Sequence, residues 1–74
     1  MASNIENRRE RFKRLATART NAVLKKLKVL SNCSNRQAYE YTEEEIDKIF
    51  ATIDKYLKST KSKFHFPKEE RFKL

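Results

Sequence analysis

The chain has 74 residues, with 18 Lys and Arg against 10 Asp and Glu, no glycine and a single cysteine. A chain this short buries only about 60% of its unfolded surface, so we expect its core to need a second copy or a larger partner. The lone Cys33 excludes an internal disulfide, and without a signal-peptide pattern it indicates a reducing, cytoplasmic location. No apolar run approaches the roughly 18 residues of a membrane span, so we expect no membrane association.

The formal net charge of +8 is unevenly distributed along the chain. Residues 1–30 contain nine basic and two acidic side chains, whereas residues 43–57 contain five acidic and two basic ones. Residues 58–74 are basic again, with six basic and two acidic side chains. Such asymmetry indicates a polyanion or an acidic protein surface as the partner. The alternative is a basic surface that only keeps the chain in solution.

The first predicted element is a helix over about residues 4–31. Ser3 and Glu6 have the spacing of a capping box, and the next 25 or so residues contain neither Pro nor Gly. The apolar residues recur at spacings of three and four, as one face of a helix requires. They are Phe12, Leu15, Ala16, Ala22, Val23, Leu27 and Leu30.

Residues 32–42 form the predicted connection, and a second helix follows over about residues 43–60. Because the chain has no glycine, Asn32 or Asn35 would supply any left-handed residue that the turn needs. Thr42 and Glu45 form the clearest capping box in the chain, and three consecutive glutamates suit the positive end of a helix dipole. The apolar positions of this helix are Ile46, Ile49, Phe50, Ile53, Tyr56 and Leu57.

These elements predict an all-α fold in two parts. Residues 1–63 would form an antiparallel two-helix hairpin with an ordered connection. Residues 64–74 would form a Phe-rich basic tail that packs back on the hairpin or on a neighbour. A homodimer in the form of a four-helix bundle would cover the apolar faces of such a hairpin.

The sequence shows no catalytic constellation, so we expect no enzyme, no cofactor and no metal site. His65 is the only histidine and has no nucleophile close to it in sequence. Cys33 has no second cysteine for a redox pair or a zinc site. The glutamates at 43–45 are accounted for by helix capping.

What remains is surface chemistry on the first helix. With Phe12 facing inward, basic residues alternate on the outward side with Thr17 and Asn21, which can donate hydrogen bonds. Such a stripe can follow a phosphate backbone. The predicted nucleic-acid-binding residues are Arg8, Arg9, Arg11, Lys13, Arg14, Lys25 and Lys28. If the partner is instead a protein, the expected anchors are aromatic or arginine residues, namely Arg36, Tyr39 and Phe72.

Three segments also resemble a group of short, poorly characterised bacterial proteins of plasmids, prophages and other mobile elements. They are Arg-Leu-Ala-Thr-Ala-Arg-Thr-Asn (14–21), Asn-Cys-Ser-Asn-Arg (32–36) and Tyr-Glu-Tyr-Thr-Glu-Glu-Glu-Ile-Asp-Lys-Ile-Phe (39–50). The resemblance covers roughly Phe12 to Leu57 and implies a bacterial or phage setting and a compact helical hairpin. The basic stripe favours a nucleic-acid-binding accessory protein of a mobile element. The resemblance raises a second function, an inhibitor or adaptor that occludes a site on a host protein, as anti-CRISPR proteins do, and a purely structural assembly module is the third.

Overall fold

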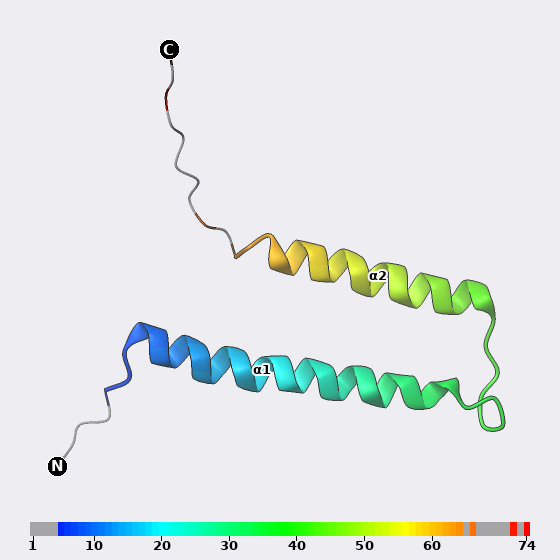
Figure 1. The fold of residues 1–74 in the computed structure, drawn as a ribbon. Coiled ribbons are helices and arrows are strands. Elements are labelled where there is room, and N and C mark those ends of the chain that lie inside the picture. The colour runs from blue at the N-terminus through cyan, green and yellow to red at the C-terminus, as the bar shows by residue number, and fades with distance from the viewer. Residues whose placement is uncertain (1–4, 65, 67–71, 73) are drawn as a thin grey trace. The chain divides into compact units, whose positions relative to one another are not determined.

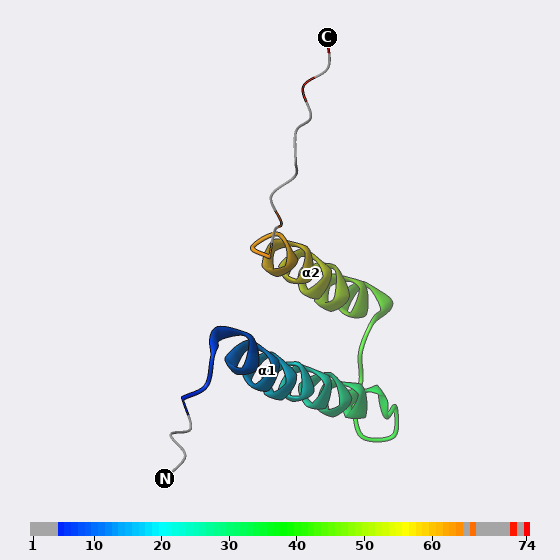
Figure 2. The same ribbon diagram turned by 60° about the vertical axis from the view of Figure 1, so that its left-hand side comes forward.

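The computed structural model of the chain describes residues 5–64, 66, 72 and 74 (Figure 1). In this part of the chain the secondary structure is helical throughout and no strand occurs. The elements are α1 (Arg8–Ser31), a short 3-10 helix η1 (Asn32–Ser34) and α2 (Glu43–Lys61). Both long helices run without a visible kink (Figures 1 and 2). The all-α prediction is therefore confirmed, while the antiparallel packing and the dimeric bundle stay predictions.

The chain divides into two compact units, Met1–Glu40 and Tyr41–Leu74. The first unit contains α1 and η1, and the second contains α2. The boundary falls inside the predicted connection of residues 32–42, so that segment is shared between the two units.

Helix α1 begins four residues later than predicted, at Arg8. Asn7 is its N-cap, and the Asn7 Oδ1 atom accepts a hydrogen bond from the backbone N–H of Glu10 at 2.8 Å. Asparagine is one of the preferred N-cap residues, so this cap competes with the predicted one, whose Ser3 lies outside the described residues. The predicted capping box at Glu6 is wrong, because Glu6 precedes the helix.

The connection turns without any left-handed residue. After η1, the Asn35 side chain accepts from the backbone N–H of Gln37 at 3.0 Å, and the Asn35 carbonyl accepts from the N–H of Tyr39 at 2.9 Å. None of the residues that the structure describes has a positive φ angle. The turn therefore needs no left-handed residue from Asn32 or Asn35. Instead, 3-10 geometry and hydrogen bonds to Asn35 make the turn.

Helix α2 begins at Glu43, as predicted. The Thr42 Oγ1 atom accepts from the backbone N–H of Glu45 at 3.1 Å, and the Glu45 carboxylate accepts from the backbone N–H of Thr42 at 2.8 Å. Both halves of the capping box are thus present. Tyr41 and Ile46, which flank this cap, are only partly exposed, as expected if the two side chains form a hydrophobic staple.

No residue in the described part of the chain is fully buried. In α1 only Leu15, Ala16 and Leu30 are partly shielded, and in α2 only Ile46 and Ile53 are. Each helix therefore carries an apolar face that stays substantially exposed. Among the described residues, no helix combines the length and hydrophobicity needed to cross a bilayer.

Four residues of the predicted tail are described, namely Phe64, Phe66, Phe72 and Leu74, and all four are exposed. Phe66 and Phe72 are 87% and 84% exposed, and Leu74 is also exposed. The rest of this prediction falls on residues 65, 67–71 and 73, which lie outside the described residues. Packing of the tail, on the hairpin or on a neighbouring molecule, stays a prediction.

Candidate nucleic-acid interface

Positive charge is concentrated on α1. Nine of its 24 residues are Lys or Arg, and Glu10 is its only acidic residue. The seven predicted nucleic-acid-binding residues all lie on this helix and are all exposed to solvent. We call them the α1 basic surface: Arg8, Arg9, Arg11, Lys13, Arg14, Lys25 and Lys28. At 1.5 Å per residue the helix is about 36 Å long, so the charges are spread over several phosphate spacings.

Hydrogen-bonding residues lie between the charges. Thr17 and Asn21 are exposed and, by helical periodicity, share the side of α1 that carries Arg14, Lys25 and Lys28. The first half of this side forms a shallow, open depression, lined by Glu10, Lys13, Arg14, Thr17, Ala18 and Asn21. An open depression suits an extended polyanion better than it suits a small molecule, which would require a concave site.

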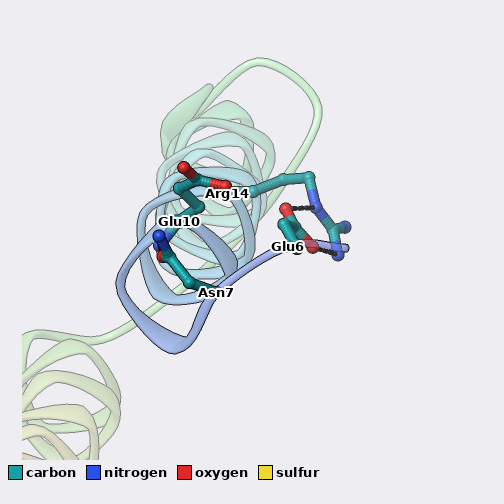
Figure 3. Close-up of polar contacts among 4 residues, drawn as sticks. All are labelled: Glu6, Asn7, Glu10 and Arg14. Atoms are coloured by element: carbon teal, nitrogen blue, oxygen red, sulfur yellow. Dashed lines mark hydrogen bonds and ion pairs between the residues drawn. The ribbon is translucent and has the colours of Figure 1, made fainter. Parts of the chain in front are cut away.

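Arg14 is held by an ion pair that the sequence did not predict. Its Nε and Nη2 atoms donate to the two carboxylate oxygens of Glu6, at 2.6 and 2.9 Å (Figure 3). The Arg14 side chain remains 60% exposed, whereas that of Glu6 is 29% exposed. These hydrogen bonds lower the pKa of Glu6 and raise that of Arg14, and the Coulomb attraction between the two charges acts in the same direction.

This ion pair has two consequences for the α1 basic surface. Glu6 offsets the charge of one of the seven basic residues, so a polyanion would have to displace its carboxylate to reach Arg14. The guanidinium is also already oriented for a planar, bidentate oxyanion, the geometry in which arginine binds phosphate. The contact was missed because Glu6 was assigned to the helix. The pattern Asn7-x-x-Glu10, an N-cap residue followed by Glu at the third helical position, was the signal that could have revealed the later start.

The first turn of α1 contains two arginines and one glutamate. Because the helix begins at Arg8, both Arg8 and Arg9 lie in its first turn, where the helix dipole is also positive. Cations at this end are unfavourable for the helix, whereas Lys28 in the last turn is favourable. Glu10 in the same turn and Glu6 just before the helix offset part of the arginine charge at this end.

The residues predicted for a protein partner are separated between the two units. Arg36 and Tyr39 belong to the first unit, in the turn that follows η1, and Phe72 belongs to the second. The side chains of Tyr39 and Phe72 are 54% and 84% exposed. Exposed aromatic side chains of this kind are typical anchors of protein interfaces.

The remaining reactive groups form no site in the described part of the chain. Cys33 is a free, exposed thiol. Within the described residues, no group of three His, Cys, Asp or Glu side chains is arranged to hold a metal ion. His65 lies outside those residues.

Comparison with known proteins gives no further guidance. No protein-family model, curated protein or solved structure matches the chain. The resemblance to short mobile-element proteins therefore stays a prediction, and the candidate interface depends on the geometry of α1.

Proposed function

We propose that this chain is a small nucleic-acid-binding accessory protein of a phage or mobile element, which acts by binding and not by catalysis. The observation that carries the proposal is the α1 basic surface, in which seven exposed cations occupy one helix. Cations spaced along a helix neutralise successive phosphates and release counterions from the nucleic acid. Thr17 and Asn21 would add hydrogen bonds to phosphate oxygens without reading sequence.

The binding mode has a recognisable dependence on salt. Each phosphate contact that is removed should reduce the slope of log affinity against log salt concentration by about one, and it should do so for unrelated sequences alike. A protein that reads base edges would instead lose affinity for one sequence more than for others.

The experiment titrates the full chain against random duplex and single-stranded oligonucleotides at two salt concentrations, by fluorescence anisotropy. The test variants are Lys25→Gln and Lys28→Gln, and the matched control is Lys55→Gln, an exposed lysine of α2. We expect both test variants to weaken binding and to reduce the salt slope, with little change for the control. Absence of binding at the lower salt concentration, or an equal effect of Lys55→Gln, would contradict the proposal.

A second candidate function is supported by the exposed aromatic residues. Tyr39 and Phe72 suit an inhibitor or adaptor that occludes a site on a host protein. In that case Tyr39→Ala, Phe72→Ala or Arg36→Ala should abolish binding to the host protein, while Lys25→Gln and Lys28→Gln should have small effects. The oligonucleotide titration separates the two functions, since an occluding protein would not bind bare nucleic acid near physiological salt.

A further inference from the structure

One member of the α1 basic surface differs from the others in its surroundings. Arg14 forms an ion pair with Glu6, whereas the other six cations make no ion pair within the described part of the chain. Arg14 therefore already holds an oxyanion, and this oxyanion belongs to the chain itself.

The segment before α1 brings Glu6 to Arg14. Asn7, the N-cap residue, is extended, with φ −76° and ψ 171°, and Glu6 precedes it. The Glu6 carboxylate meets the guanidinium of a residue eight positions further along the chain (Figure 3). The cap itself does not use this contact, because the Asn7 side chain alone accepts from the backbone N–H of Glu10. The start of α1 therefore does not depend on the ion pair.

The Glu6 carboxylate occupies atoms with which Arg14 would hold a phosphate. Arginine binds carboxylates and phosphates in the same way, through two parallel N–H groups on one edge of the guanidinium. In the structure the edge formed by Nε and Nη2 donates to both carboxylate oxygens of Glu6, at 2.6 and 2.9 Å. A phosphate at this edge has to displace Glu6, and a phosphate elsewhere on the guanidinium lies beside its negative charge. Both arrangements weaken the contact.

We propose that Glu6 is an autoinhibitory carboxylate, which competes with the phosphates of nucleic acid for Arg14. This inference rests on the proposed function, since it requires the α1 basic surface to bind phosphate. Its consequence is that the chain binds nucleic acid less tightly than its seven cations would allow. Removal of this one carboxylate makes Arg14 fully available to phosphate.

The experiment is a double-mutant cycle of the full chain, with Glu6→Gln, Arg14→Gln and the two combined. Affinity for random duplex and single-stranded oligonucleotides is measured by fluorescence anisotropy at one low salt concentration. Glutamine is a good helix former and neither residue is the N-cap, so circular dichroism should show the same helix content in all four chains. We expect Glu6→Gln to raise affinity about threefold to fivefold, the upper part of the range for an exposed ion pair. In the Arg14→Gln background the same change should raise affinity less than about twofold.

The cycle separates competition for Arg14 from simple repulsion. Loss of any carboxylate near the interface reduces its repulsion of phosphate. Without Arg14 the charge of Glu6 is no longer neutralised, so simple repulsion predicts an equal or larger gain in the Arg14→Gln background. Such a gain would overturn the proposal.

Glu10 provides the matched control. It is an exposed glutamate in the first turn of α1, four residues before Arg14, a spacing at which the two side chains can pair on a helix. In the structure, however, the partner of Arg14 is Glu6. The gain from Glu10→Gln should therefore be similar with and without Arg14. If this gain depended on Arg14 as strongly as the gain from Glu6→Gln, the assignment of the competing carboxylate to Glu6 would be wrong.

The outcomes also separate this inference from the proposed function. Absence of binding by every chain at low salt would overturn the proposed function, and this inference with it. Binding that Glu6→Gln leaves unchanged or weakens would overturn this inference alone, because Glu6 would then be neutral or would help to position Arg14.

Discussion

Glu6 and Arg14 form a bidentate ion pair in the first unit. The two side chains are eight residues apart, and Glu6 reaches Arg14 only because it lies just before the helix and not within it. The hydrogen bonds stabilise the charged form of the carboxyl group, so they lower the pKa of Glu6. The contribution to stability is present above the ordinary carboxyl pKa and is lost as the pH falls through the lowered one.

A titration of the Glu6 carboxyl group by NMR tests this contact directly. We expect the Glu6 pKa to lie below the usual glutamate range in the unaltered chain and to return to that range in Arg14→Ala. Arg14→Lys retains the charge but removes the planar fork. Because hydrogen bonds from Arg14 are the main cause of the lowered Glu6 pKa, this variant should also lose most of the shift. A Glu6 pKa that is the same in all three chains would contradict the contact.

The N-cap residues decided how accurately the start of each helix could be predicted from the sequence. Two N-cap patterns overlap before α1. Serine and asparagine are similarly preferred at the N-cap position, so the sequence did not decide between Ser3 and Asn7. Before α2 a single pattern, from Thr42 to Glu45, was reinforced by neighbouring glutamates and by Tyr41. The start of α2 was therefore predictable to the residue, whereas the start of α1, and with it the role of Glu6, was not.

At the level of the element, the cap of α2 is the local interaction whose loss is easiest to interpret. Thr42 joins this cap through both its side chain and its backbone, whereas Thr52, in the middle of the helix, only donates from its hydroxyl to the Lys48 carbonyl at 2.8 Å. A mid-helix threonine has lower helix propensity than alanine, so its hydroxyl contributes little to the helix.

We expect Thr42→Ala to lower the free energy of unfolding by about 1 kcal/mol. The matched variant Thr52→Ala makes the same change within the same helix and should be neutral or stabilising by a few tenths of a kcal/mol. Urea unfolding followed by circular dichroism measures both. Equal midpoints for Thr42→Ala and the unaltered chain would show that the cap does not limit the stability of α2.

For the whole molecule, helical periodicity predicted the existence and type of both long helices but not their association. No described residue is buried, so the apolar stripe of each helix does not show which surface packs against it. The nucleic-acid interface on α1 stays a prediction. All seven residues named from the sequence are exposed on α1. The structure adds that one of them, Arg14, is paired with Glu6.

In the first turn of α1, the charges that would favour phosphate binding are unfavourable for helix stability. The two effects can be measured separately. Arg9 lies in the first turn of α1, where a cation is unfavourable, and Lys28 lies in the last turn, where it is favourable. Local rules of this kind are often broken at functional sites. If the arginines at this end serve to bind phosphate, their replacement should improve the helix and impair binding.

We expect Arg9→Glu to raise the free energy of unfolding by about 0.5–1 kcal/mol and Lys28→Glu to lower it by a similar amount. Both variants remove a phosphate contact and add repulsion, so both should weaken oligonucleotide binding and reduce its salt slope. Thermal unfolding by circular dichroism and anisotropy titrations measure the two quantities on the same samples, and Arg9→Gln and Lys28→Gln serve as intermediate steps. If Arg9→Glu left binding unchanged while it stabilised the chain, Arg9 would not belong to the interface. If it destabilised the chain, the helix dipole would not be the force that acts on this residue.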